Sequence, residues 1–186
     1  METPKRMELV NAIVKKVRPL LQDHQTKNVL DYGSGSGLVS LELADLVNSV
    51  LLVDTSEQAL QEAADKIASR GISNCTVLRS DFTQAFPDLK ADMVLLSLVL
   101  LHIPNTQDVL QKLFHVLPDG GQLIIVDFDK NERVSHPKIH NGFVHDELKH
   151  LLTDIGFTTL SMETFYHGEQ IFANQDASMF VSVHTK

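Results

Sequence analysis

The sequence offers its clearest chemistry in a glycine loop and in three aspartates that follow short apolar runs. Residues 28–37 read Asn-Val-Leu-Asp-Tyr-Gly-Ser-Gly-Ser-Gly, a β-rich run that leads directly into three spaced glycines. Glycines allow a tight turn and let a ligand lie against bare backbone. Asp31 ends this first run, Asp54 ends the next one, and Asp81 follows the third. Because open α/β sheets bind ligands at the carboxyl ends of their strands, we expect these carboxylates to meet around one ligand.

The details of the loop argue against two common nucleotide sites. A dinucleotide fingerprint has its third glycine three places after the second, and that position is Leu38. A phosphate-binding loop has Gly-Lys-Ser/Thr, and no lysine or arginine occurs in residues 28–65. Carboxylates without cations favour an adenosine ligand that carries positive charge and no phosphate. Asp54 is suited to accept hydrogen bonds from both ribose hydroxyls, and Asp81 with Phe82 suits an adenine amino group and its ring face.

These residues resemble a known family. Asp31-Tyr-Gly-Ser-Gly-Ser-Gly looks like the first motif of class I S-adenosylmethionine-dependent methyltransferases. Asp54 matches the ribose-binding acid of that family, and Ser80-Asp81-Phe82 matches its adenine contact. The resemblance implies S-adenosylmethionine as the cofactor, with Asp31 and the glycine loop on its methionine moiety. The cofactor-binding residues expected on this basis are Asp31, Tyr32, Gly33, Ser34, Gly35, Gly37, Asp54, Thr55, Ser80, Asp81, Phe82 and Ser97.

The resemblance extends over residues 25–186. Residues 91–101 and 119–128 are similar to the fourth and fifth strands of the family, including a Pro-Asp-Gly-Gly turn. Residues 145–157 are similar to a helix ending in Gly-Phe that many small-molecule members carry. The implied fold is a doubly wound sheet with strand order 3-2-1-4-5-7-6 and an antiparallel seventh strand.

Methyl transfer from a sulfonium is a direct displacement, so the main task of such an enzyme is to hold the nucleophile and the methyl carbon in line within about 3–3.5 Å. A base is needed only where the acceptor must lose a proton. His102, just past the fourth strand, and His140 are the candidates, with packing in a helical turn as the alternative role for His102. His136, His140 and His145 cluster where the family often builds its acceptor pocket. They lack a carboxylate-histidine motif of fixed spacing, so no metal site is expected.

The elements that must position these residues alternate along the chain. β-rich runs at 28–32, 49–54, 75–80, 92–97 and 122–128 are separated by apolar stripes at helical spacing, and a helix is expected directly after the glycine loop. Thr55 and Gln58 form a capping-box pair before one stripe. Such alternation predicts an α/β fold in three layers, with helices on both faces of a mostly parallel sheet.

The two ends of the chain differ from this middle. An opening helix is expected up to Pro19. The tail holds strand-like segments at 158–166 and 177–185, joined by too few residues for a helical crossover, so they should pair antiparallel. We predict one domain over residues 1–186, in which residues 1–24 and the loop 129–144 close the pocket as lids.

Composition narrows the class of protein. The 186 residues carry a net charge of −8, which lowers the expectation of a nucleic-acid partner. No segment reaches the roughly 18 apolar residues that would span a bilayer, and the first residues lack the pattern of a signal peptide. The single cysteine, Cys75, excludes an internal disulfide. We expect a cytoplasmic protein, monomeric or homodimeric, without a membrane partner.

The acceptor is narrowed mainly by motifs that are missing. Enzymes that methylate amino groups of bases carry Asp/Asn-Pro-Pro-Tyr/Phe after the fourth strand, where this chain has Ser97-Leu-Val-Leu. A small-molecule acceptor is therefore the leading hypothesis, with a protein side chain also open. The alternative from another class is a catalytically silent S-adenosylmethionine-binding module that acts through a protein partner. A nicotinamide-dependent oxidoreductase is disfavoured by Leu38.

Overall fold

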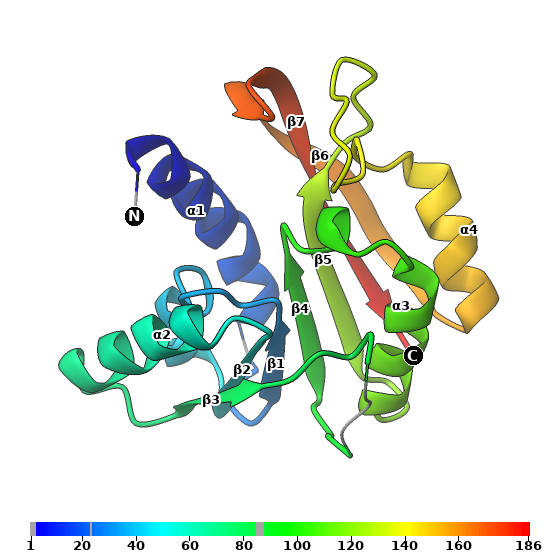
Figure 1. Ribbon diagram of the computed structural model, residues 1–186. Helices are drawn as coiled ribbons and strands as arrows, with labels where there is room; N and C mark the ends of the chain where they lie inside the picture. Colours follow the sequence, from blue (N-terminus) through cyan, green and yellow to red (C-terminus); the bar gives the residue numbers. More distant parts are fainter. Residues whose placement is uncertain (1–2, 23, 85–87) are drawn as a thin grey trace.

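The computed structural model describes residues 3–22, 24–84 and 88–186, and the strands within these ranges form one seven-stranded sheet (Figure 1). The order is β3-β2-β1-β4-β5-β7-β6, with β7 antiparallel to both of its neighbours and the other described pairs parallel. This arrangement confirms the predicted order and the antiparallel seventh strand. The strands are β1 (Asn28–Tyr32), β2 (Ser49–Asp54), β3 (Cys75–Arg79), β4 (Met93–Ser97), β5 (Gln122–Phe128), β6 (Thr158–Phe172) and β7 (Gln175–Thr185).

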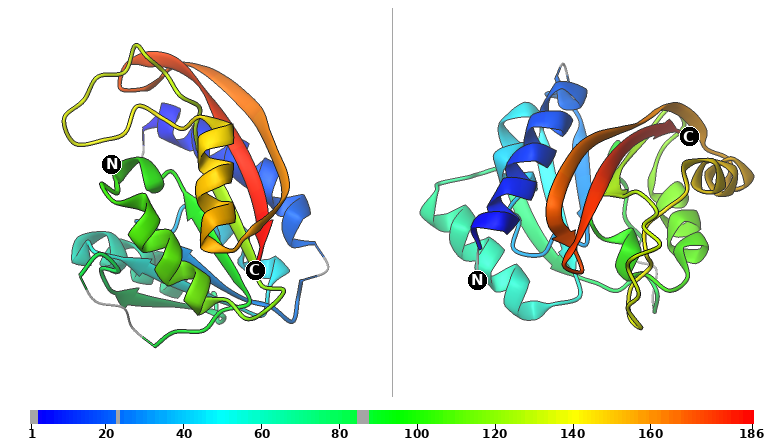
Figure 2. Two further views of the ribbon diagram at one scale, coloured as in Figure 1. Left: turned by 90° about the vertical axis from the view of Figure 1, so that its right-hand side faces the viewer. Right: turned by 90° about the horizontal axis from the view of Figure 1, so that it is seen from above.

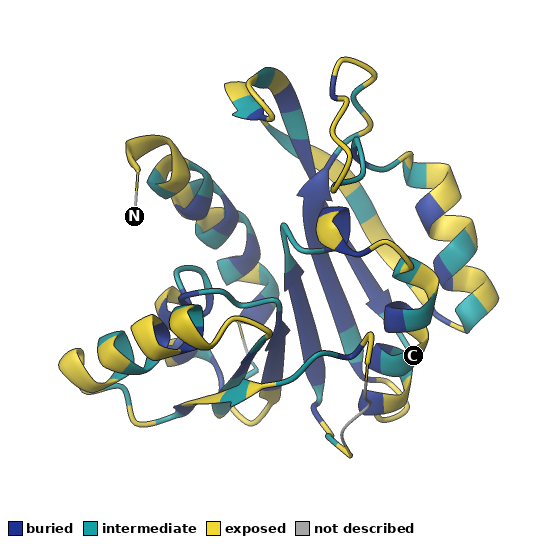
Figure 3. Ribbon diagram, viewed as in Figure 1, coloured by how far each residue is buried: buried dark blue, intermediate teal, exposed yellow. Residues whose placement is uncertain are grey.

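Helices cover both faces of the sheet, as the alternation of elements predicted. Figure 2 shows α1 (Pro4–Val17) and α2 (Glu57–Ser69) on one face, and α3 (Thr106–Val116) and α4 (His145–Ile155) on the other. Successive strand residues point to opposite faces, so the central strands β1, β4 and β5 are mostly apolar and are buried on both sides (Figure 3). Within the described ranges, no helix has both the length and the apolar character needed to cross a membrane.

The segment after the glycine loop differs from the expected helix. Residues Ser40–Glu42 (η2) and Ala44–Leu46 (η3) form two short 3-10 turns instead. Their i→i+3 hydrogen bonds, such as the one from the Leu43 N–H to the Ser40 carbonyl, wind the chain more tightly than an α-helix. This winding buries Leu41, Leu43 and Ala44 within only eleven residues between the loop and β2.

The start of α2 also differs from the prediction. The hydroxyl of Ser56 accepts a hydrogen bond from the Ala59 N–H at 3.2 Å, so Ser56 is the N-cap and the predicted capping box of Thr55 and Gln58 is wrong. The helix begins one residue later because the Ser56 N–H is itself held by the carboxylate of Asp54, at 2.8 Å. Asp54 therefore fixes the chain exactly where β2 leads into α2.

The last two strands form a longer hairpin than predicted. β6 continues to Phe172, which pairs with Gln175, so only Ala173 and Asn174 remain as a two-residue turn. Both turn residues have positive φ, 49° and 61°, as the tight turns favoured in β-hairpins require. The sequence-based estimate of a ten-residue connection missed this because neither residue is a glycine.

The end of α4 gives a test of packing in this fold. Gly156 ends the helix with a φ of 120°, and a Cβ at this position would lie 2.9 Å from Cζ of Phe114. Gly71 has a φ of 63° after α2, but a Cβ there would meet no atom within 4 Å. Gly156→Ala should therefore lower the free energy of unfolding by about 2–4 kcal/mol, and Gly71→Ala by only about 1 kcal/mol, in urea titrations. Equal losses in the two variants would contradict the proposed clash with Phe114.

Candidate functional site

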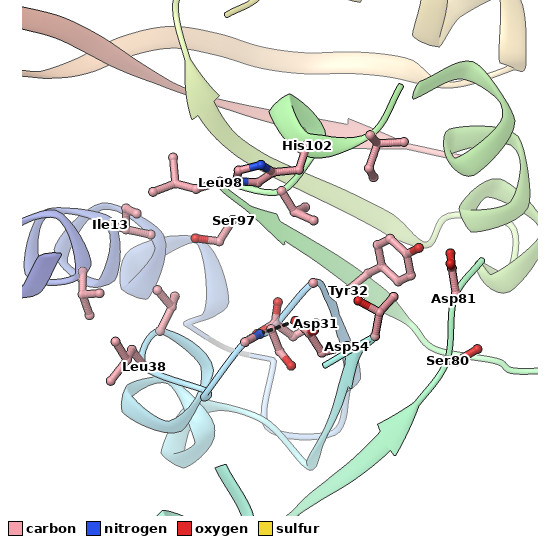
Figure 4. Close-up of a pocket in the computed structure, with 18 of the residues that line it drawn as sticks. Ile13, Asp31, Tyr32, Leu38, Asp54, Ser80, Asp81, Ser97, Leu98 and His102 are labelled. Carbon is pink, nitrogen blue, oxygen red and sulfur yellow. Dashed lines mark hydrogen bonds between the residues drawn. The ribbon is translucent and has the colours of Figure 1, made fainter. Parts of the chain in front are cut away.

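A cavity of about 610 Å³ opens at the carboxyl ends of β1, β2 and β4, and α1 forms part of its wall (Figure 4). Its volume is typical of small-molecule sites, which span about 300–1,000 Å³. Figure 4 shows Asp31 and Asp54 side by side at the strand ends, with Ser97, Leu98 and His102 across the cavity. Most of the predicted site residues line it: Asp31, Tyr32, Gly33, Ser34, Gly35, Asp54, Thr55, Ser80, Asp81, Ser97 and His102.

Three predicted site residues, Phe82, Gly37 and His140, are not among the residues that line the cavity. The ring of Phe82 is fully buried and packs against Tyr32 at a centroid distance of 4.6 Å, so it is not free to stack on a ligand. A Cβ on Gly37 would fall among the side chains of Leu41 and Leu52 rather than in the cavity. His140 lies behind the site, where its Nε2 contacts the Ile103 carbonyl at 2.7 Å.

Asp31 is the most unusual group in the cavity wall. Its residue is only 2% exposed, and its Oδ2 accepts a hydrogen bond from the Ser40 hydroxyl. Its Oδ1 is buried and has no hydrogen-bond partner. Burial raises the pKa of Asp31 from 3.8 to about 7, the Ser40 hydrogen bond opposes this, and the charge of Asp54 adds to it. A cation next to Oδ1 would supply the missing partner.

Asp54 holds the glycine loop against β2. One carboxylate oxygen accepts the Gly35 N–H at 2.7 Å, while the other accepts the Ser56 N–H. The N–H groups of Gly33 and Ser34 both donate to the Val53 carbonyl, at 2.8 and 3.1 Å. The loop is therefore fixed by its own backbone donors before any ligand arrives.

Gly33 allows the loop to approach the segment that follows β4. Its φ is 77°, and a Cβ at this position would lie 2.1 Å from Cγ2 of Val99. No other residue type fits this contact without moving Val99. The close approach joins the two halves of the cavity, because Val99 also lines it.

The other half of the cavity is mainly apolar. Leu9, Val10 and Ile13 of α1 face Leu98 and Val99 across it. Its titratable side chain beside Leu98 is His102, at the end of the 3-10 turn Leu100–His102 (η4). Burial lowers the pKa of His102 below its usual 6.5, and the charge of His136 acts in the same direction. The described residues make no hydrogen bond to either ring nitrogen of His102.

A fully buried carboxylate supports the turn that carries His102. Asp127, at the end of β5, accepts the Leu101 N–H at 3.3 Å and the Phe128 N–H at 2.8 Å. Burial raises its pKa to about 7. Asp127 does not line the cavity, so it acts on the site through the position of the η4 backbone.

The sequence analysis missed Arg6. The fold brings this residue, in the first turn of α1, to the cavity wall beside the glycine loop. Its Nη2 lies 3.9 Å from the position that a Cβ on Gly35 would occupy. It is the only lysine or arginine among the described residues that line the cavity. Although residues 28–65 contain no lysine or arginine, the fold therefore brings a cationic side chain close to the glycine loop.

The loop 129–144, whose role as a lid stays a prediction, contributes none of the residues that line the cavity. Its ends are joined instead by a hydrogen bond between His145 Nε2 and Asp129 Oδ1 at 2.7 Å. The other Asp129 oxygen accepts the Thr164 hydroxyl. In the part of the chain that is described, no group of three or more His, Cys, Asp or Glu side chains is placed to hold a metal ion.

The composition of the cavity fits a cationic nucleoside. Three carboxylates, those of Asp31, Asp54 and Asp81, line one half, and one of them has a buried oxygen without a partner. Ser80 and Asp81 end the cavity on the side of β3 (Figure 4). S-adenosylmethionine offers an ammonium group, a sulfonium, ribose hydroxyls and an adenine amino group to such a wall.

A family described as "Methyltransferase domain" matches residues 23–170. The chain belongs to this family. Its Rossmann-like fold and its cofactor, S-adenosylmethionine, agree with the resemblance in the glycine loop. Similar curated proteins include ubiquinone/menaquinone biosynthesis C-methyltransferases from Azotobacter vinelandii, 28% identical over 62% of this chain and 47% of that protein, and from a Marinomonas species, 31% identical over 56% and 43%. The chain thus spans about half the length of these relatives.

Solved structures show the same fold at low sequence identity. A putative methyltransferase from Bacillus halodurans has a TM-score of 0.80 at 17% identity, with 93% of this chain and 98% of that chain covered. Coclaurine N-methyltransferase bound to S-adenosylhomocysteine has a TM-score of 0.76 at 13% identity, with 95% and 72% covered. The [4+2]-cyclase SpnF matches with a TM-score of 0.77 at 16% identity, with 94% and 81% covered, so the fold alone does not fix the reaction.

The buried carboxyl of Asp31 should make the ligand-free protein less stable at high pH. Its pKa in the folded protein is raised, so its contribution to stability is full below about pH 4 and is lost as the pH rises through about 7. Asp31→Asn keeps an acceptor for Ser40 and removes the charge. Thermal unfolding should show the variant more stable than the wild type at pH 8, by up to about 4 kcal/mol, and nearly equal at pH 4. Asp119→Asn, at an exposed turn carboxylate, is the control and should show no such difference. A difference for Asp31→Asn that does not change with pH would contradict this account.

Proposed function

We propose that the chain transfers the methyl group of S-adenosylmethionine to a small, largely apolar acceptor. The observation that carries the proposal is Asp31, a buried carboxylate with one oxygen unpartnered in the wall of a cavity that otherwise fits an adenosine ligand. Leaving such a group unpaired costs free energy, and binding of a cation recovers it. A site that only stored an uncharged nucleoside would have no use for this charge.

Each carboxylate in the cavity has a proposed partner on the cofactor. Asp31 binds the ammonium group of the methionine moiety. Asp54 accepts from the ribose hydroxyls with the lone pairs that Gly35 and Ser56 leave free. Asp81, with Ser80, contacts the adenine amino group, while Tyr32 presents its ring to the cavity in the place that the sequence analysis gave to Phe82.

The acceptor is proposed to lie between α1 and the segment after β4. The side chains there are Leu9, Val10 and Ile13 on one side and Leu98 and Val99 on the other, so the acceptor presents mostly apolar surface. Such walls exclude water and hold a small molecule in line with the methyl group. A small apolar acceptor also suits the names of the curated relatives, which are C-methyltransferases of ubiquinone and menaquinone biosynthesis.

His102 is the proposed base where the acceptor loses a proton. Its side chain faces the apolar half of the cavity, and its lowered pKa keeps the imidazole neutral at pH 7. A neutral imidazole with free ring nitrogens accepts a proton from a hydroxyl, an activated carbon or an ammonium group. S-adenosylmethionine supplies the electrophilic methyl group. The described residues align the acceptor, exclude water, and provide His102 as the base that takes the proton.

Calorimetric titration tests the cofactor half of the proposal. The wild type should bind S-adenosylmethionine saturably and should not bind NADH. Asp31→Asn should weaken binding at pH 8 by about 10- to 100-fold, because a charged hydrogen bond to the ammonium group is lost. Asp119→Asn should bind as the wild type does. Unchanged affinity in Asp31→Asn would exclude the proposed ammonium contact.

Product analysis tests the transfer itself. The protein is incubated with S-adenosylmethionine and a panel of ring-hydroxylated aromatic compounds and secondary amines, and products are examined by mass spectrometry for the gain of one methyl group. Methylation of an apolar panel member is the expected result. Cofactor binding without any methylated product across carbon, oxygen and nitrogen acceptors would favour a silent binding module.

With an acceptor in hand, His102→Gln tests the base. The variant should bind S-adenosylmethionine within about 2-fold of the wild type but should turn over about 100-fold more slowly or worse. In the wild type, kcat should fall as the pH drops through the pKa of His102, which lies below 6.5, since protonation removes the base. His102→Gln should lack this acidic limb. A variant with the same rate and the same pH profile would show that His102 only lines the cavity.

A further inference from the structure

The amino-acid end of S-adenosylmethionine carries a carboxylate as well as an ammonium group. The glycine loop is an unsuitable donor for it. Gly33 and Ser34 donate their N–H groups to the Val53 carbonyl, and Gly35 donates to Asp54. The Ser34 hydroxyl also contacts the Val53 carbonyl, at 3.4 Å. These three residues are the part of the loop 33–37 that lines the cavity, so each cavity-lining N–H of the loop already has an internal acceptor.

The charge of the surrounding wall also opposes a second anion. Asp31 and Asp54 lie beside the loop, and the charge of Asp54 is already felt by Asp31. A carboxylate placed next to them without a cation would be repelled. The ligand therefore needs a positive group from another element at this point.

Arg6 is such a group. Its Nη2 lies 3.9 Å from the position of a Cβ on Gly35, directly beside the loop. Its guanidinium makes no ion pair or hydrogen bond with the residues that the structure describes, and each oxygen of nearby Asp54 already accepts one backbone N–H. The first turn of α1 contains no acidic residue, so the positive end of the helix dipole adds to the charge of Arg6.

We infer that Arg6 binds the carboxylate of the methionine moiety of S-adenosylmethionine. The guanidinium presents two parallel N–H donors, which match the two oxygens of a carboxylate. Asp31 and Arg6 then hold the two charges of one amino-acid group from opposite elements, β1 and α1. This makes the first turn of α1 part of cofactor recognition, and it makes the protein select ligands that retain the carboxylate.

The test combines substitutions of Arg6 with removal of the carboxylate from the ligand. S-adenosylhomocysteine is compared with its decarboxylated analogue, 5′-(3-aminopropylthio)-5′-deoxyadenosine, which keeps the adenosine, sulfur and amine. Affinities are measured by calorimetry for the wild type, Arg6→Ala and Arg6→Lys. The wild type should prefer S-adenosylhomocysteine by about 10-fold or more, and Arg6→Ala should lose most of this preference by weakening only the carboxylate-bearing ligand. Arg6→Lys should retain part of it.

Lys5→Ala is the matched control. It removes the same charge from the same turn of α1, but Lys5 does not line the cavity and its Nζ contacts the Gln170 carbonyl. It should leave the preference unchanged. Alanine is a strong helix former, so neither substitution weakens α1 through propensity.

Two outcomes would overturn the inference. An equal loss of affinity for both ligands in Arg6→Ala would mean that Arg6 only closes the cavity, and unchanged affinity for S-adenosylhomocysteine would mean that it takes no part in binding. The choice of acceptor does not enter this experiment, so its result is independent of the proposed methyl transfer. A wild type that binds neither ligand would overturn the cofactor assignment itself.

Discussion

Asp31 carries a carboxylate inside the protein with a hydrogen bond to only one of its two oxygens. A buried charge without full partners costs free energy, so the surrounding chain is arranged around it. Ser40, which starts the first 3-10 turn, donates to one oxygen, and this contact fixes where the chain goes after the glycine loop. The other oxygen has no hydrogen-bond partner and is the proposed contact of the cofactor ammonium group. In this proposal, the same carboxylate lowers the stability of the ligand-free protein and raises its affinity for a cation.

The parallel sheet explains why so much of this site could be predicted from sequence. Asp31 pairs in register with Leu52 on β2, and Ser97 ends β4, on the other side of β1. Strands that run in parallel place their last residues at one edge, so residues far apart in the chain meet if each ends a strand. Asp54 and Ser80 lie at the ends of β2 and β3 for the same reason. The strand order itself came from the resemblance, because apolar runs alone do not state which strands are neighbours.

The misses have physical causes that the sequence does not display. Phe82 follows Asp81 directly, but it lies in the turn beyond β3, where its N–H donates to the Tyr32 hydroxyl and its ring enters the core. The turn at Ala173 and Asn174 adopts positive φ without a glycine, and Asn174, a residue type that tolerates positive φ, is only a weak local signal for it. Arg6 is separated from the glycine loop by more than twenty residues, and only the packing of α1 against the sheet brings it there. Residues that end parallel strands can be assigned to the site from the sequence, whereas a residue that helix packing brings there, such as Arg6, cannot.

The two ends of α1 are held with very different strength. Ile13 and Val17 are at most 1% exposed and pack in the main core with Leu21, and burying each such side chain contributes about 1.5–3 kcal/mol. Among the described residues, the polar contacts of α1 to β6 are an ion pair of Lys16 with the exposed Glu163, a hydrogen bond between Glu8 and Tyr166, and one from Lys5 to the Gln170 carbonyl. Exposed pairs of this kind contribute about 1 kcal/mol or less.

Figure 2 shows α1 beside the β6–β7 hairpin. The carboxyl end of the helix is held by the core, while its first two turns, which carry Arg6, make the weak polar contacts of Lys5 and Glu8 to this hairpin. A free-energy change of about 1 kcal/mol is enough to change the population ratio of two positions of such a turn several-fold. An ion pair with the cofactor carboxylate is of that size or larger. Backbone hydrogen bonds hold the glycine loop in the cofactor half of the cavity, whereas residues of α1 form part of the wall of the acceptor half. If Arg6 binds the cofactor carboxylate as inferred, the bound cofactor adds a contact to the first turn of this helix. An acceptor would then enter a pocket whose wall is completed by the cofactor already bound.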